Sequence, residues 1–332
     1  MDKKPKKKII VILGPTASGK SNLGVVLARE IGGEVISADS RQVYKGLDIG
    51  TGKVARDKII RNAKSYKLKA KSYYHRGIPH HLLDVVSLRQ LTLHGAQGFT
   101  AAQFKILAEK KIEEIAQRKK VPIVVGGTGF YIDTLLGAVA LPHVPPNQKL
   151  RAALNKKSTE DLFTQLKKLD PRRTKTMDKK NKVRLVRAIE IARALGKVPA
   201  LKKPGQKYAV LKIGLAPDDK ALKDNIRVRL LARIKKGMIG EAKKLHRQGL
   251  SWKRMEELGL EYRYLSKFLQ GKITKKEMTE KLKTEIWRYA KRQRRWFKRD
   301  TDIKWFTPSA VEGFSPTERK KIKKEITKFL TV

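Results

Sequence analysis

The sequence predicts an α/β protein with a parallel β-sheet core, a helical insertion domain and C-terminal helices. An apolar, mostly β-branched run at Ile9–Leu13 leads through a glycine turn directly into a helical pattern. Further short apolar runs alternate with helical patterns up to residue 141, which is typical of a parallel sheet. After the proline-broken segment LPHVPPN, helical periodicity dominates the chain. These three observations together define the fold class.

The turn after the first strand matches the motif G-x-x-x-x-G-K-[ST] at Gly14, Gly19, Lys20 and Ser21. Because it lies between a strand and a helix, its backbone N–H groups and the helix N-terminus form a concave anion site. We expect Lys20 to reach terminal phosphate oxygens and the Ser21 hydroxyl to bind Mg²⁺. The motif predicts a P-loop NTPase-like core, and a chance glycine-rich turn is the alternative.

Two more turns are expected at the same edge of the sheet. A strand over residues 34–38 ends at Asp39, and a strand over residues 122–125 ends at a second glycine turn that contains Thr128. The carboxyl ends of parallel strands meet along one edge, where ligands of open α/β sheets bind. We therefore expect the P-loop, Asp39 and Thr128 to converge on one site.

Between these turns the sequence predicts a strand over residues 80–86 and a long helix that begins after Thr100. A simple P-loop ATPase also needs an acid that binds Mg²⁺ at the end of an apolar strand. Asp39 and Asp84 both satisfy that requirement by spacing. ATP hydrolysis is therefore a second interpretation of the motif.

The predicted domain organisation has three parts. Residues 1–8 form a basic tail, residues 9–141 and 208–332 form the core with its C-terminal helices, and residues 142–207 form the helical insertion. An alternating run at residues 208–215 predicts the return to the sheet, and the pattern from residue 218 onward is helical. The basic segment at residues 54–76 is compatible with a solvated helix pair or with an arm that faces RNA.

The composition indicates the class of partner. The 332 residues include 78 Lys and Arg against 31 Asp and Glu, a formal net charge of +47. Such an excess predicts a polyanionic partner, with nucleic acid first and an anionic membrane surface second. The chain has 0 Cys residues, which suits a reducing cytoplasm, and no apolar run approaches the ~20 residues of a membrane span. We expect a cytoplasmic protein, a monomer, without a membrane partner.

The chain also resembles a known family through six motifs in order: GPTASGKS, SADSRQVYKGLDIGTGK, GIPHHLLDV, VPIVVGGTGFY, RLVRAIEI and YAKRQRRWF. These motifs look like those of tRNA dimethylallyltransferases, and the resemblance runs from about Ile9 to Phe306. It implies that the P-loop binds the diphosphate of dimethylallyl diphosphate, with Mg²⁺. It also implies transfer of the dimethylallyl group to N6 of the adenosine 3′-adjacent to the anticodon, in the anticodon stem-loop of tRNA.

The resemblance further implies roles for individual residues. Asp39 and Thr128 are expected at the catalytic centre, with Asp39 accepting a proton from N6. Diphosphate binding is expected of Gly14, Thr16, Ala17, Ser18, Gly19, Lys20, Ser21 and Arg229, with Ser21 also holding the metal. Contacts to tRNA are expected of Asp39, Ser40, Arg41, Gln42, Thr128, Arg151, Val183, Arg184, Arg187, Arg292 and Gln293.

Simpler roles compete with some of these assignments. Asp39 could be a helix cap or a Mg²⁺ ligand, and Thr128 could cap the next helix. In the segment at residues 286–299, aromatic side chains could pack on the core while the bases face RNA, or the bases could merely be solvated. Two other functions stay open: a P-loop kinase or NTPase, and a non-catalytic RNA-binding protein.

Overall fold

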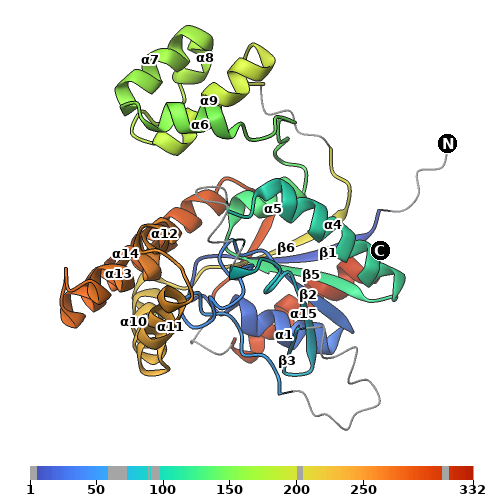
Figure 1. Cartoon of the computed structure of the whole chain (residues 1–332). Helices are drawn as coiled ribbons and strands as arrows, with labels where there is room; N and C mark the ends of the chain where they lie inside the picture. The colour runs from blue at the N-terminus through green and yellow to red at the C-terminus, as the bar shows by residue number, and fades with distance from the viewer. Residues whose placement is uncertain are drawn as a thin grey trace, which may run out of the picture. The chain divides into compact units, whose positions relative to one another are not determined.

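The described strands form one sheet in the order β3-β4-β2-β5-β1-β6-β7 (Figure 1). Residues 6–58, 73–88, 90, 98–199, 205–308 and 314–331 are described by the computed structural model of the chain. The strands are β1 (Lys8–Leu13), β2 (Gly33–Ser37), β3 (Tyr73–His75), β4 (Ile78–His81), β5 (Val121–Gly126), β6 (Ala209–Leu215) and β7 (Ile303–Phe306). Every ladder is parallel except that of β3 with β4, which confirms the predicted α/β core.

The central strand β1 pairs with β5 on one side and with β6 on the other, with Leu13 opposite Gly126 and Gly214. Its apolar residues are fully buried, as expected of a parallel strand that is covered on both faces. The strand begins at Lys8, inside the expected basic tail, because the Lys8 backbone is in register with Ala209.

The predicted strand over residues 80–86 is wrong in its extent. The strand β4 ends at His81, and the backbone then takes positive φ angles of 62° at Leu82 and 57° at Asp84. Such left-handed residues interrupt an extended strand. The edge strands β3 and β7 were not predicted. Most of the basic segment at residues 54–76 lies outside the described residues, and Tyr73 begins β3 at its end.

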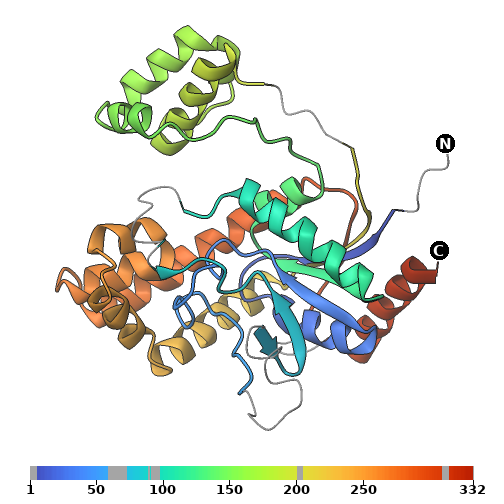
Figure 2. The same cartoon turned by 45° about the vertical axis from the view of Figure 1, so that its right-hand side comes forward.

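Helices cover both faces of the sheet (Figures 1 and 2). The helices α1 (Lys20–Glu30) and α15 (Pro316–Thr331) pack with Ile10 and Ile12 of β1 in one apolar cluster. The helices α4 (Ala101–Gln117) and α5 (Gly129–Leu135) lie on the opposite face. Thr100 forms a capping box with Gln103 at the start of α4, which confirms the predicted helix start.

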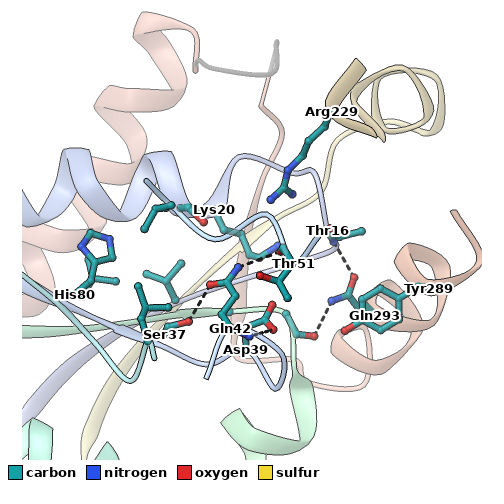
Figure 3. Close-up of a pocket in the computed structure, with 17 residues that line it drawn as sticks. Thr16, Lys20, Ser37, Asp39, Gln42, Thr51, His80, Arg229, Tyr289 and Gln293 are labelled. Carbon is teal, nitrogen blue, oxygen red and sulfur yellow. Dashed lines mark hydrogen bonds between the residues drawn. The ribbon is translucent and has the colours of Figure 1, made fainter. Parts of the chain in front are cut away.

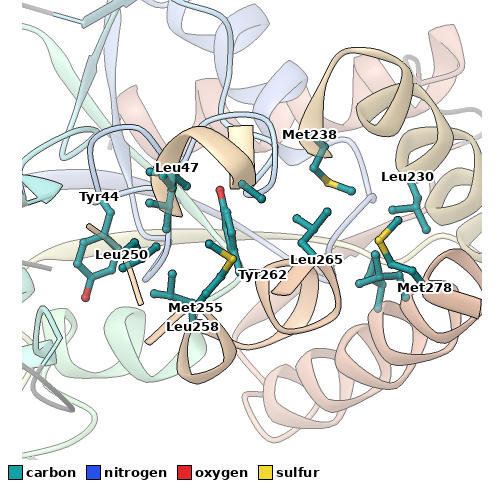
Figure 4. Close-up of a cluster of buried hydrophobic side chains, with 14 of the residues drawn as sticks. Tyr44, Leu47, Leu230, Met238, Leu250, Met255, Leu258, Tyr262, Leu265 and Met278 are labelled. Carbon is teal, nitrogen blue, oxygen red and sulfur yellow. The ribbon is translucent and has the colours of Figure 1, made fainter. Parts of the chain in front are cut away.

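Further helices follow β6: α10 (Asp219–Lys235), α11 (Met238–Arg247), α12 (Trp252–Leu258), α13 (Leu260–Leu269) and α14 (Lys275–Phe297). Their apolar faces share a buried cluster with Tyr44 and Leu47, from the segment that follows β2 (Figure 4). Two segments that are about 200 residues apart in the sequence are therefore packed into one core. Ordering both segments costs conformational entropy, which the shared apolar burial offsets. This core positions the loops described below.

The chain divides into two compact units, Met1–Leu136 with Gln206–Val332, and Gly137–Gly205. The second unit contains α6 (Gln148–Asn155), α7 (Thr159–Leu169), α8 (Pro171–Thr174) and α9 (Lys182–Leu195). It has its own apolar core, in which Leu154, Leu162 and Leu185 are buried. The short segment is thus able to bury a hydrophobic face without help from the sheet.

Candidate active site

Three turns meet at the carboxyl ends of β1, β5 and β2, which are adjacent in the sheet. They surround a pocket that opens to solvent (Figure 3). The predicted residues that line it are Thr16, Lys20, Ser21, Asp39, Gln42, Arg229 and Gln293. The convergence of the P-loop and Asp39 is therefore present in the structure, although the roles of these residues stay predictions.

One end of the pocket is suited to an anion. Burial, together with the charge of Arg229, lowers the pKa of Lys20 to about 7. A neighbouring hollow is lined by Ala17, Ser18, Gly19 and Lys20. The Ser18 hydroxyl is buried and has no hydrogen-bond partner among the described residues. An anion bound there would give the Ser18 hydroxyl a partner and would give the Lys20 amine, which already donates to the Pro15 carbonyl oxygen, a counter-charge.

Arg229 brings a second cation to this end from helix α10. Its guanidinium donates to the Gly52 carbonyl oxygen at 3.0 Å. Burial, with the nearby charge of Arg233, lowers the pKa of Arg229 to about 10, so the group is still charged at neutral pH. Lys20 and Arg229 therefore approach the same space from different parts of the chain (Figure 3).

Asp39 lies between this anion end and a second hollow that it also lines. Its Oδ1 accepts hydrogen bonds from the backbone N–H of Arg41 at 2.8 Å and of Gln42 at 3.3 Å. Among the described residues, no group donates to Oδ2. The carboxylate is thus held by its own loop with one oxygen left for a ligand.

The turn after β5 is tied to the Asp39 loop. The Thr128 hydroxyl accepts from the Ser40 backbone N–H at 3.1 Å, and the Thr128 N–H donates to the Ala38 carbonyl oxygen at 3.3 Å. Thr128 is the N-cap residue of helix α5, but its side chain makes no capping bond to that helix. Its observed contact instead joins two of the three turns.

Gln293, in helix α14, joins the remaining turn. Its side-chain Oε1 accepts from the Thr16 backbone N–H at 2.8 Å, and its Nε2 donates to the Gly127 carbonyl oxygen at 2.8 Å. The side chain is buried, and both amide atoms are used by backbone groups. One glutamine thus links the P-loop with the turn after β5.

The opposite end of the pocket is apolar. Val35, Leu83 and Val125 line it together with His80. Burial lowers the pKa of His80 to about 4, so its imidazole is neutral at pH 7. This end offers no charge and suits a small hydrocarbon group.

The second hollow, on the other side of Asp39, is larger and rich in basic and aromatic side chains. Its lining includes Ser40, Arg41, Arg229, Arg233, Arg263, Tyr264, Tyr289 and Arg292. Aromatic and guanidinium planes can stack with unpaired bases, and cations attract phosphates. The hollow therefore has the chemistry of a site for single-stranded nucleic acid.

Several lining residues were not predicted from the sequence. Thr51 lines both cavities, and Tyr289 and Arg233 come from helices far along the chain. The glycine-punctuated LDIGTGK stretch is the only local signal for Thr51. Asp84, by contrast, forms an ion pair with the buried Lys53 and does not line the pocket, which leaves Asp39 as its acid.

In the second unit the predicted residues fall into two groups. Arg151 makes a bidentate contact with the buried Glu190 at 2.9 and 2.7 Å, and Arg187 also pairs with Glu190. Burial opposes ionisation, but the bonds from Arg151 and Arg187 hold the pKa of Glu190 below its usual value. Val183 and Arg184 are exposed at the start of α9.

Metal ligands are sparse around the pocket. The described residues contain no group of three or more His, Cys, Asp or Glu that could hold a metal ion. Mg²⁺ commonly binds with one or two protein oxygens, substrate phosphates and water. The Ser21 hydroxyl, which lines the anion end beside Lys20, fits that mode of binding.

A family model described as IPP transferase matches residues 42–300. The chain is 42% identical over 300 residues to tRNA dimethylallyltransferase 2 of Treponema denticola. This alignment covers 89% of this chain and 92% of that protein. It is 36% identical over 305 residues to tRNA dimethylallyltransferase of Anoxybacillus flavithermus, and this alignment covers 90% of each protein. None of the described helices is long and apolar enough to cross a membrane.

Solved structures show the same fold. The full-length tRNA isopentenylpyrophosphate transferase from Bacillus halodurans is 30% identical, with a TM-score of 0.65, over 98% of this chain and 99% of that one. A eukaryotic dimethylallyltransferase acting on tRNA is 26% identical, with a TM-score of 0.74, over 96% of this chain and 78% of that one. The similarity extends across the sheet, the second unit and the C-terminal helices.

Proposed function

The chain belongs to the IPP transferase family, and we propose how its pocket performs the transfer of a dimethylallyl group to tRNA. The donor is dimethylallyl diphosphate, and the acceptor atom is N6 of the adenosine 3′-adjacent to the anticodon. One observation supports this most: Asp39 lines both the pocket with the anion end and the aromatic, basic hollow. A general base at that position can contact the prenyl donor on one side and the acceptor nucleoside on the other.

The donor binds with its diphosphate at the P-loop and its hydrocarbon group at the apolar end. Lys20 and Arg229 neutralise the charge that develops on the diphosphate as the allylic carbon–oxygen bond breaks. The backbone N–H groups of residues 14–21 and the Ser18 hydroxyl complete the cradle. Ser21 would hold Mg²⁺ together with the phosphates, and the ion would supply charge neutralisation at the leaving oxygens.

The adenine amine attacks the allylic carbon, and a nitrogen–carbon bond forms while diphosphate leaves. Asp39 orients N6 and accepts its proton through the oxygen that its own loop does not use. An exocyclic amine is a weak nucleophile, so alignment contributes as much as basicity. Thr128 supports this geometry through its contact with the Ser40 backbone.

The acceptor base must leave its stack to enter the pocket, which costs a few kcal/mol. Contacts along the anticodon stem-loop offset this cost. We assign them to the lining of the hollow, including Arg41 and Arg292, and to the exposed residues Val183 and Arg184 of the insertion at residues 142–207. The net charge of +47 supports such a partner. A monomer is sufficient, since one chain supplies every group named.

The test is mass spectrometry of tRNA nucleosides after incubation with the protein, Mg²⁺ and dimethylallyl diphosphate. We expect dimethylallyl-adenosine at one position beside the anticodon. Parallel incubation with ATP and tRNA examines the NTPase alternative. Phosphate release without prenyl transfer would favour a kinase or NTPase, and tRNA binding without either reaction would favour an RNA-binding protein.

A further inference from the structure

A carboxylate outside the pocket holds one of its walls. The loop at residues 48–52 follows the buried Leu47 and carries Thr51, which lines both cavities. Its backbone N–H groups are not paired in a sheet or helix. Those of Asp48, Ile49 and Gly50 converge instead on the Glu241 side chain, which comes from helix α11, almost 200 residues later in the chain.

The carboxylate uses both oxygens. Glu241 Oε2 accepts from the backbone N–H of Asp48 at 2.9 Å and of Ile49 at 2.6 Å. Glu241 Oε1 accepts from the backbone N–H of Gly50 at 2.9 Å and from the Tyr262 hydroxyl at 2.7 Å. Successive N–H groups that point at one anion are a strong and directional anchor.

The opposite side of the same loop directs two arginines. The Gly50 carbonyl oxygen accepts from Arg233 at 2.7 Å, and the Gly52 carbonyl oxygen accepts from Arg229 at 3.0 Å. Arg229 has no other hydrogen bond to a described residue. The Gly52 carbonyl oxygen thus joins the Arg229 guanidinium to the same loop that is bonded to Glu241.

The packing leaves the loop little freedom. A Cβ at Gly50 would lie 2.6 Å from the Tyr262 ring, and a Cβ at Gly52 would lie 2.3 Å from an Arg229 nitrogen. Gly52 also has a φ of 63°, which side chains rarely adopt. The Tyr262 ring is buried in the apolar cluster, so its hydroxyl is fixed against Glu241 (Figure 4).

We propose that Glu241, supported by Tyr262, is a positioning residue that holds the 48–52 loop and thereby aims Arg229 at the diphosphate site. It does not touch the substrates and acts only through the loop. The inference rests on the proposed function for the identity of the anion, a prenyl diphosphate. It predicts that loss of Glu241 weakens binding of the diphosphate and spares binding of tRNA.

The test compares Glu241→Gln with the wild-type chain. Glutamine keeps the size of the side chain but replaces one acceptor oxygen with a donor, which faces N–H groups. We expect the KM for dimethylallyl diphosphate and the Kd for inorganic diphosphate with Mg²⁺ to rise about tenfold, while the Kd for tRNA stays within about twofold. Calorimetry with inorganic diphosphate does not depend on prenyl transfer, so it tests the loop even if the proposed reaction is wrong.

Glu280→Gln is the matched control, because Glu280 is exposed in α14, pairs only with Lys283 among the described residues and loses the same charge. It should change none of these three constants. Tyr262→Phe is the second variant, because it removes one hydrogen bond to Glu241 but keeps the ring, and we expect a smaller rise in the same constants. If Glu241→Gln weakens tRNA and diphosphate equally, or neither, and Tyr262→Phe does the same, the positioning role is wrong.

Discussion

Arg229 lies close enough to Lys20 for its charge to lower the pKa of the lysine, although the two residues are about 200 positions apart. Both line the same pocket, where the charge of Asp39 only partly offsets the effect of burial on the pKa of each cation. Two like charges in one partly desolvated pocket repel each other and are poorly solvated. A bound polyanion relieves both effects, so the pocket is prepared for a ligand with more than one negative charge.

The first prediction concerns pH. Lys20 has a lowered pKa of about 7, so it loses its proton as pH rises through neutrality. Only the protonated amine attracts a diphosphate, so the KM for dimethylallyl diphosphate should rise above pH 7, approaching about tenfold per pH unit. Binding should also raise the pKa of Lys20, so the complex takes up a proton at pH 8.

Calorimetry in buffers of different ionisation enthalpy measures that proton uptake. The Lys20→Ala variant is the control. It should bind the diphosphate weakly at every pH and lose the pH dependence of KM between pH 6 and pH 8. A wild-type KM that stays flat across this range would contradict the role of Lys20 at the phosphates.

The second prediction concerns the base. Asp39→Ala should lower kcat by about 10²–10⁴, because N6 loses both its orienting group and its proton acceptor. The Kd for tRNA should stay nearly unchanged, because Asp39 is one of many groups in the hollow. Single-turnover prenylation and filter binding measure the two quantities. Near-normal turnover of this variant would contradict the assignment of Asp39 as the general base.

The third prediction concerns Gln293. Gln293→Glu keeps the acceptor for the Thr16 N–H but removes the donor to the Gly127 carbonyl oxygen. The variant should lose about 1–3 kcal/mol of unfolding free energy, because a buried acceptor is left without a partner beside a carboxylate. Its kcat/KM should fall as the two turns separate. Gln117→Glu, at an exposed position in α4, is the control for charge and should change neither quantity.

The fourth prediction separates two arginines of the second unit. Arg151→Ala should lower the stability of that unit by about 1–3 kcal/mol, because the buried Glu190 loses a bidentate partner. Arg184→Ala should leave stability unchanged, since the side chain is exposed. It should instead reduce the slope of log K against log salt for tRNA binding by about 0.7–0.9. Thermal unfolding and a salt titration distinguish the two, and equal stability losses would contradict the separation.

The parts of the fold that the sequence predicted are those with local signals. The first strand, its glycine turn and the following helix are contiguous in the sequence. Thr100 and Gln103 form a capping box, which is a local signal for the start of a helix. The edge strands β3 and β7 are only three and four residues long. In β7 only the two end residues are buried, so its pattern does not alternate as a longer strand would.

Local signals predicted the site only on its N-terminal side, and Arg229 and Gln293 were expected through the family resemblance alone. Asp39 follows a strand, and its place beside the P-loop follows from parallel sheet geometry. Tyr289 and Glu241 come from helices whose placement depends on the shared apolar core, which no local pattern encodes. Gln293 lies between basic residues in the sequence, yet it is on the buried side of α14, where its side-chain amide forms hydrogen bonds with two backbone groups.

The position of β1 at the centre of the sheet also has a consequence for the order of folding during synthesis. One of its neighbours, β5, is made early, but the other, β6, begins only at Ala209. Until then one edge of β1 has unpaired backbone groups, and such open edges are prone to pair with other chains. Arg229 and Gln293 emerge later still. A nascent chain that already carries its P-loop and Asp39 therefore lacks these two lining residues of the pocket until most of the polypeptide has been synthesised.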